Sequence, residues 1–153
     1  MVNPRSKGQR GEREAYHMLN AMIMDVMRGL GFPETRIQAA ATTVQRNQNQ
    51  TAVGGSDLVN TFGLAIEIKR HENISPINSW WNQTVAAATR NGEIPVLLYR
   101  QNHGKWRCQT LMQVECPVGD GRMFRAEIDY DSFCIWFKDW VRVKLQQGES
   151  VRT

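Results

Sequence analysis

The segment "GLAIEIKR", residues 63–70, constrains the fold of this chain more than any other stretch. Its apolar residues recur with the two-residue period of a β-strand that has one buried face: Leu64, Ile66 and Ile68. Glu67 and Lys69 fall together on the other face, with side chains about 6 to 7 Å apart. Burying two charges costs free energy unless each has a partner or an ion. The segment therefore predicts a rigid strand whose polar face carries either a structural salt bridge or a functional site.

Helices are predicted from apolar residues spaced three and four apart and from the residues that begin and end them. One helix runs from about Gly8 to Leu30 and ends at Gly31. A second has Ser75 as its N-cap, Pro76 in the first turn and Gly92 as its stop. A third begins at the cap Asp131. The apolar residues of this third helix are Phe133, Ile135, Trp136, Trp140, Val141 and Leu145.

Short strands are predicted between these helices, over residues 36–43, 57–59, 64–69, 94–100 and 105–114. The order of helix, strands, helix, strands and helix indicates an α/β fold, with helices on the faces of a mixed sheet. The 153 residues suffice for a single domain with one core. We expect a flexible basic arm over residues 1–10 and a flexible loop over residues 44–55, which is polar and contains glycine.

Composition narrows the class of protein. No apolar run is long enough to span a membrane and the N-terminus does not resemble a signal peptide, so we expect a soluble, cytoplasmic protein without a membrane partner. The net charge of +4 is concentrated near the N-terminus. This concentration suits a polyanion, although such a segment can also be merely solubilising. The odd number of cysteines, without a CxxC pair, indicates reduced thiols, and a bound metal would be a hard, oxygen-bound cation.

Acidic residues from three segments are predicted to meet near the strand that contains Glu67. A short turn would return the carboxylate of Asp57 beside Glu67, and two adjacent carboxylates repel each other unless they bind a cation. Glu12 lies on the inward side of the first helix, whereas Glu14 is expected to face water. Together with Lys69, these acids suit metal-assisted hydrolysis of a phosphodiester.

Three stretches resemble a known family. The pattern of Asp57, nine residues and then "EIK" is similar to the PD-(D/E)xK nuclease signature, with Ser56 at the position of the usual proline. "SKGQRGERE", residues 6–14, resembles the opening of archaeal Holliday-junction resolvases and their phage relatives. "NGEIPVLLYRQNHGKWRC", residues 91–108, is similar to a strand and turn of the same family. The resemblance spans residues 6–108, and the C-terminal part is less distinctive.

This resemblance implies a restriction-endonuclease-like mixed β-sheet flanked by helices, and a site that uses Mg²⁺, for which Mn²⁺ substitutes. Asp57 and Glu67 would be metal ligands, with the Ile68 carbonyl and with Glu12 directly or through water. Lys69 would orient or activate the attacking water, and Gln83 would assist. Cleavage in this family leaves 5′-phosphate and 3′-hydroxyl ends.

The implied partner is branched DNA, a four-way junction, bound by a homodimer because two strands must be cut symmetrically. Basic residues at the N-terminus and elsewhere are candidate phosphate contacts: Arg5, Lys7, Arg10, Arg13, Arg46 and Arg70. Candidate dimer contacts, which could equally be core residues, are Trp80, Trp81, Phe137 and Trp140, with Trp81 expected to be the most exposed. No segment resembles a base-reading element, so we expect recognition of DNA shape.

Two other functions are compatible with the same residues. One is a restriction-like, nicking or repair nuclease that acts on linear or damaged duplex DNA. The other is a DNA-binding module that keeps the fold without catalysis. The complete set of Asp57, Glu67 and Lys69 argues against the second, because a cluster of buried charges is costly to retain without a use.

Overall fold

The computed structural model describes residues 4–48, 55–73, 76–113 and 121–151, with side chains from residue 8 onward. Helices and strands alternate along the chain after an N-terminal helical region. In order, the elements are α1 (Pro4–Gly29), α2 (Glu34–Ala39), the 3₁₀ helix η1 (Ala40–Thr42), β1 (Gln45–Arg46), β2 (Leu58–Val59), β3 (Leu64–His71), α4 (Ile77–Asn91), β4 (Ile94–Gln101), β5 (Arg107–Gln113), β6 (Met123–Asp129) and α5 (Tyr130–Gln146).

The main sheet has the strand order β3-β4-β5-β6, in which β3 and β4 are parallel and the other neighbours are antiparallel. The parallel pair is connected through the crossover helix α4, as parallel neighbours in a sheet require. β1 and β2 form a separate antiparallel pair. The prediction of a mixed α/β sheet flanked by helices is confirmed, and β3 is an outer strand of that sheet.

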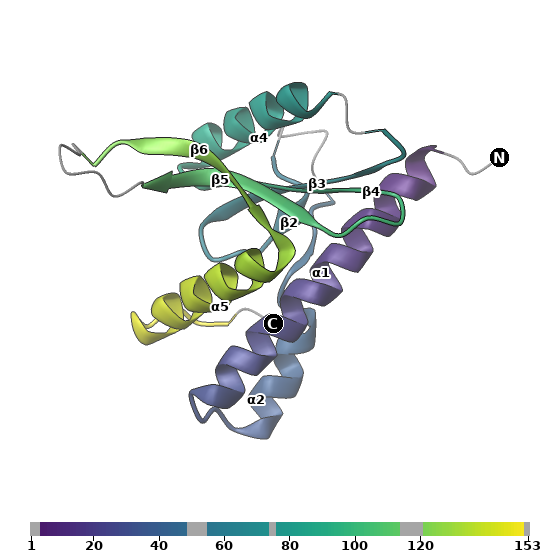
Figure 1. The fold of residues 1–153 in the computed structure, drawn as a ribbon. Coiled ribbons are helices and arrows are strands. Elements are labelled where there is room, and N and C mark those ends of the chain that lie inside the picture. Colours follow the sequence, from purple (N-terminus) through teal and green to yellow (C-terminus); the bar gives the residue numbers. More distant parts are fainter. Residues whose placement is uncertain (1–3, 49–54, 74–75, 114–120, 152–153) are drawn as a thin grey trace.

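The sheet separates two hydrophobic cores (Figure 1). Helix α4 covers one face, where Trp80 and Trp81 pack against Leu97 and Tyr99. Helices α1 and α5 cover the other face and share the larger core with Ile66 and other apolar residues of β3 and β4. In the parallel register Glu67 lies beside Leu97 and Lys69 beside Tyr99. Glu67 and Lys69 therefore belong to the face that α4 covers.

The strand predicted over residues 36–43 is wrong, because this segment forms α2 and η1. Its alanine-rich sequence favours a helix. The carbonyl of Pro33 accepts hydrogen bonds from the backbone N–H groups of Arg36 and Ile37, which begins the first turn. Local helix propensity thus outweighs the short apolar alternation on which the strand prediction depended.

Two segments expected to be flexible contain regular structure. Helix α1 begins at Pro4, so that residues 4–10 lie within its first turns, and the flexibility of this segment stays a prediction. Within the predicted loop of residues 44–55, Gln45 and Arg46 form β1 and pair with β2. Residues 49–54 lie outside the described residues.

The C-terminal part also departs from the predictions. Strand β6 was missed because most of its side chains are exposed, so that no buried face marks it in the sequence. The N-cap of α5 is Asp129, whose Oδ1 accepts the Ser132 N–H at 2.8 Å, and not Asp131. Ile135, predicted as an apolar-face residue of this helix, is 66% exposed. Gly92, by contrast, ends α4 in a left-handed conformation as predicted, whereas the predicted cap Ser75 lies outside the described residues.

The aromatic residues considered as dimer contacts are mostly core residues of the single chain. Trp80, Trp81 and Phe137 are buried, and the expectation that Trp81 is exposed is wrong. Trp140 is half-buried and donates its indole N–H to the Phe62 carbonyl at 3.0 Å. Packing within the chain therefore explains these residues without a partner subunit.

Two further predictions concern the cysteines and the membrane. Cys108 is buried and Cys134 is half-buried, and both are free thiols, while Cys116 lies outside the described residues. Burial raises the pKa of the Cys108 thiol, which keeps it protonated. Among the described helices, none combines the length and apolar character needed to cross a membrane.

Candidate active site at the outer edge of the sheet

Asp57 binds to the free edge of β3 through both its backbone and its side chain. Its N–H donates to the Ile66 carbonyl at 3.1 Å, and its Oδ2 accepts the Ile68 N–H at 2.7 Å. The N–H and C=O of one strand residue point to the same edge, so the Ile68 carbonyl faces the side on which Asp57 lies. The predicted return of Asp57 to this strand occurs, although β2 itself pairs with β1.

The carboxylates of Asp57, Glu67 and Glu12 are buried close together. These residues are 8%, 3% and 8% exposed. Burial raises the pKa of Asp57 to about 8, and the neighbouring charge of Glu67 adds to this effect. Burial also raises the pKa of Glu67, and the positive charge of Lys69 opposes this rise. Glu67 also hydrogen-bonds Asp57. Such a pair favours a shared proton or a bound cation.

Lys69 contacts Glu67 directly, and its charge also acts on Asp57. Its Nζ lies 3.0 Å from Oε1 of Glu67, and its side chain is largely buried. The salt bridge considered in the sequence analysis is therefore present, and it is part of a larger acidic cluster. The same geometry places an ammonium group beside two buried carboxyls, which is the arrangement that the nuclease interpretation requires.

Glu12 reaches the cluster because α1 packs closely on β3. Gly11 is buried, and a Cβ at this position would lie 3.1 Å from the Cβ of Arg70. The charge of Glu12 contributes to the raised pKa values of both Asp57 and Glu67, so the three acids interact. The Glu12 Oε2, however, accepts the Nε–H of Arg46 at 2.5 Å.

The donor set fits a hard divalent cation with an incomplete protein shell. Over the described ranges, no group of three or more His, Cys, Asp or Glu side chains is arranged to hold a metal ion. Asp57, Glu67 and the Ile68 carbonyl nevertheless offer oxygen donors at one edge. Mg²⁺ is commonly bound through one or two carboxylates and several waters, so these groups suffice without the direct participation of Glu12.

Three of the remaining predicted site residues have exposed side chains. Gln83 is exposed on α4 and does not share the burial of the carboxylates, so its assisting role stays a prediction. Arg10 and Arg13 are exposed on α1. The side chains of Arg5 and Lys7 lie outside the described residues.

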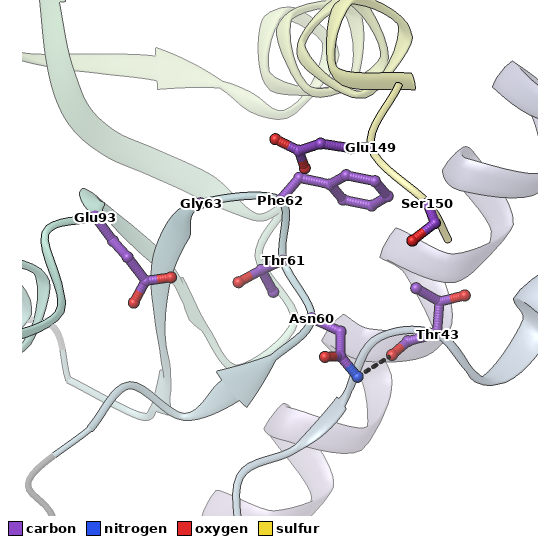
Figure 2. A pocket seen from close by; sticks show the side chains of 8 residues that line it. All are labelled: Thr43, Asn60, Thr61, Phe62, Gly63, Glu93, Glu149 and Ser150. Carbon is purple, nitrogen blue, oxygen red and sulfur yellow. Dashed lines mark hydrogen bonds between the residues drawn. The ribbon is translucent and has the colours of Figure 1, made fainter. Parts of the chain in front are cut away.

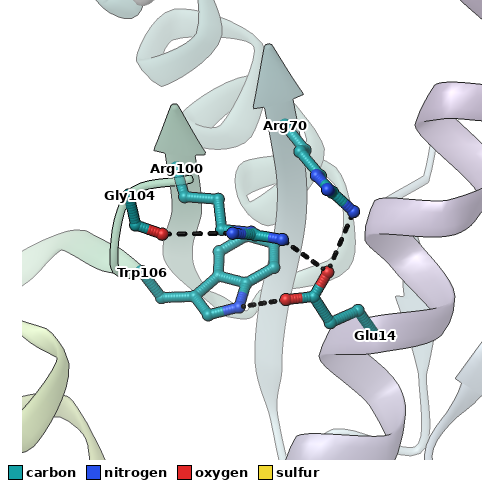
Figure 3. Close-up of polar contacts among 5 residues, drawn as sticks. All are labelled: Glu14, Arg70, Arg100, Gly104 and Trp106. Atoms are coloured by element: carbon teal, nitrogen blue, oxygen red, sulfur yellow. Dashed lines mark hydrogen bonds and ion pairs between the residues drawn. The ribbon is translucent and has the colours of Figure 1, made fainter. Parts of the chain in front are cut away.

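Glu14 was predicted to face water, but its carboxylate instead joins α1 to the ends of two strands (Figure 3). Its Oε2 accepts hydrogen bonds from Arg70 at 3.2 Å and Arg100 at 2.9 Å, and its Oε1 accepts the Trp106 indole N–H at 3.2 Å. Arg100 also donates to the Gly104 carbonyl and lies over the Trp106 ring. This network was missed, although the sequence contained a signal: the two-residue period puts Arg70 on the apolar side of β3, where it needs an acidic partner.

A separate pocket of about 260 Å³ lies at the other end of β3 (Figure 2). It includes the turn Asn60–Gly63, in which Asn60, Phe62 and Gly63 have positive φ angles. Glu93 and Glu149 contribute acidic groups to its wall, and burial raises the pKa of Glu93. None of the lining residues belongs to the carboxylate cluster, so this pocket is distinct from the candidate active site.

Comparison with known families supports the predicted relationship to PD-(D/E)xK nucleases but does not extend to the predicted relationship to Holliday-junction resolvases. Residues 3–144 match the model of a family described as "Phage putative PDDEXK endonuclease". A search of curated proteins and a search of solved structures each gave no match. Nucleases of the PD-(D/E)xK type generally use Mg²⁺ or a similar divalent metal, and the description does not specify Holliday junctions. The chain belongs to this PDDEXK endonuclease family and, as predicted, to the PD-(D/E)xK nucleases with their restriction-endonuclease-like fold.

Proposed function

We propose that the protein is a Mg²⁺-dependent endonuclease that resolves four-way DNA junctions by paired phosphodiester hydrolysis, leaving 5′-phosphate and 3′-hydroxyl ends. The observation that carries the nuclease chemistry is the contact of Asp57, Glu67 and Lys69 at the free edge of β3. The preference for a junction is supported by the resemblance of residues 6–14 and 91–108 to junction resolvases.

Each residue of the cluster has a distinct part in this proposal. Asp57, Glu67 and the Ile68 carbonyl would hold the metal, with Glu12 bound directly or through water; Mn²⁺ should substitute. The bound metal supplies polarisation of the phosphoryl group and a lowered pKa for a coordinated water. Lys69 orients the attacking water and neutralises charge that develops on the phosphoryl oxygens. The Ile68 N–H fixes the Asp57 carboxylate, so little reorganisation is needed during the reaction.

Basic residues along α1 would bring DNA to this edge. Arg10 and Arg13 are exposed on the same helix that carries Glu12, and Arg5 and Lys7 precede them in it. Contacts of this kind to phosphates supply affinity and orientation without reading sequence. Recognition of the branched shape would then provide the selectivity.

Paired cleavage requires two active sites, and we extend the proposal to a homodimer. The buried tryptophans cannot form its interface, but α5 presents the apolar residues Ile135 and Val143, which are 66% and 49% exposed. Sedimentation velocity should show a dimer for the wild-type protein and a shift towards monomer for Ile135→Asp. A monomer under conditions of paired cleavage would contradict this arrangement.

The catalytic proposal is tested on a synthetic four-way junction. Asp57→Asn and Glu67→Ala should abolish cleavage in Mg²⁺ while leaving junction binding in EDTA intact. Glu93→Gln is the matched control, because it removes a partly buried carboxylate outside the cluster. Normal cutting by either cluster variant would overturn the assignment.

A second candidate keeps the site and changes the substrate to linear duplex DNA. It is favoured by the family description, which names an endonuclease without a branched substrate. Competition between a junction and a linear duplex of the same sequence separates the two candidates. At least tenfold preference for the junction supports resolution, whereas equal affinity and equal cutting support the second candidate.

A further inference from the structure

The ion pair between Arg46 and Glu12 is unequally exposed. The side chain of Glu12 is 11% exposed, whereas that of Arg46 is 41% exposed. A buried carboxylate loses much of its hydration and needs a cation beside it, while an exposed guanidinium can return to water at little cost. Glu12 therefore depends on Arg46 more than Arg46 depends on Glu12.

Arg46 lies in β1, which pairs with the strand that directly follows Asp57. It pairs with Leu58 across β1 and β2, and the next residue, Asn47, donates its N–H to the Asp57 carbonyl at 2.8 Å. Asn20 of α1 exchanges two hydrogen bonds with the backbone of Val44, which anchors the start of this segment. The backbone of Arg46 is thus held at the acidic cluster while its side chain reaches solvent.

The charges around Glu12 favour replacement of the Arg46 guanidinium by a bound divalent cation. Glu12 interacts electrostatically with both Asp57 and Glu67, so a divalent ion bound by that pair would also satisfy Glu12. The same ion would repel the Arg46 guanidinium. A DNA phosphate offers that guanidinium a second partner, because its planar fork matches phosphate oxygens as well as carboxylate oxygens.

We propose that Arg46 holds the Glu12 carboxylate while the metal is absent and transfers to a DNA phosphate when the metal binds, so that DNA and the divalent cation favour each other's binding. This inference rests on the proposed metal-dependent nuclease function. It adds a positioning role for Arg46 and a reciprocal coupling between its two partners. Arg46 takes no part in the hydrolytic step itself.

Mn²⁺ binding without DNA provides the first test, with free Mn²⁺ measured by electron paramagnetic resonance. Arg46→Gln should bind Mn²⁺ on the order of tenfold more tightly than wild type, because the competing cation is gone. Arg46→Lys keeps a charge but loses the fork and should fall between them. Arg28→Gln removes an exposed arginine paired with Asp25 and should leave the affinity unchanged. An Arg46→Gln affinity equal to or weaker than that of wild type would overturn the proposal.

The second test measures the same Mn²⁺ affinity with and without a four-way junction. All proteins carry Lys69→Ala so that the DNA stays intact, which is verified on a gel. The junction should tighten Mn²⁺ binding on the order of tenfold in the Lys69→Ala protein and in its Arg28→Gln derivative, but less than threefold in its Arg46→Gln derivative. Equal tightening in all three proteins would show that coupling does not pass through Arg46.

Failure of this inference is distinguishable from failure of the proposed function. Asp57→Asn and Glu67→Gln should lose Mn²⁺ binding whatever Arg46 does. If they lose it while Arg46→Gln behaves as wild type, only the role of Arg46 is refuted. If they bind Mn²⁺ as wild type does, the proposed metal site is wrong and the inference is refuted with it.

Discussion

Replacing Asp57 with asparagine should stabilise the metal-free protein at pH 8 while destroying its proposed active site. The amide oxygen of asparagine can still accept the Ile68 N–H, which Asp57 accepts at 2.7 Å, and its NH₂ group can donate to Glu67. The variant therefore keeps the shape of the edge and removes one buried carboxylate. Stability at the expense of function is common where an active site holds unfavourable charges.

The magnitude follows from the pKa of Asp57. The shift from 3.8 in the unfolded chain to about 8 in the folded protein corresponds to about 6 kcal/mol, at 1.36 kcal/mol per pH unit. This is an upper limit, because Asp57 and Glu67 can share one proton and the surroundings can relax. We expect a gain of about 2 to 3 kcal/mol at pH 8.

The pH dependence has a definite sign. Between pH 4 and 8 the unfolded chain has released the Asp57 proton and the folded protein retains it, so wild-type stability falls as pH rises. The advantage of Asp57→Asn should therefore be about 2 to 3 kcal/mol at pH 8 and smaller by at least about 1 kcal/mol at pH 5.

Urea denaturation in EDTA at pH 5 and pH 8 measures this difference. Asp139→Asn is the control, since Asp139 is an exposed partner of Arg142 and its loss should change stability by less than about 0.5 kcal/mol. Added Mg²⁺ should stabilise wild type and not Asp57→Asn. A loss of stability in Asp57→Asn at pH 8, or a gain that is the same at both pH values, would refute the reasoning.

Three further changes test how α1 is held against the sheet and how the core is built. Gly11→Ala should be less stable than Gly8→Ala by about 1 to 2 kcal/mol in urea denaturation, because the added methyl group meets Arg70 only at position 11; equal stabilities would contradict the close packing. Glu14→Gln should cost about 1 to 2 kcal/mol and lower the affinity for Mn²⁺, since two arginines lose their charged partner; unchanged urea midpoints would show that the network contributes nothing. Phe137→Ala should cost about 3 to 5 kcal/mol by calorimetry, as expected for a residue with no exposed surface; a small loss independent of protein concentration would argue against core packing.

Much of the fold was predictable where the information was local. The stop at Gly92, the amphipathic helices and the alternation in β3 all depend on residues within a few positions of one another. The failures also have local causes. The alanine-rich segment 36–43 has helix propensity that the strand prediction ignored, and β6 is an exposed outer strand without a buried face to reveal it.

The amino-acid sequence alone was enough to identify the candidate acids Asp57 and Glu67, Lys69 beside them, and the strand on which Glu67 and Lys69 stand. Which charges meet depends on how the helices pack against the sheet. In the folded chain, Asp57 binds to the edge of β3, Glu12 pairs with Arg46, and Glu14 pairs with Arg70 and Arg100. These partners are separated by 11 to 86 positions along the chain. No local period specifies such pairs, because they form only when helix α1 packs against the completed sheet.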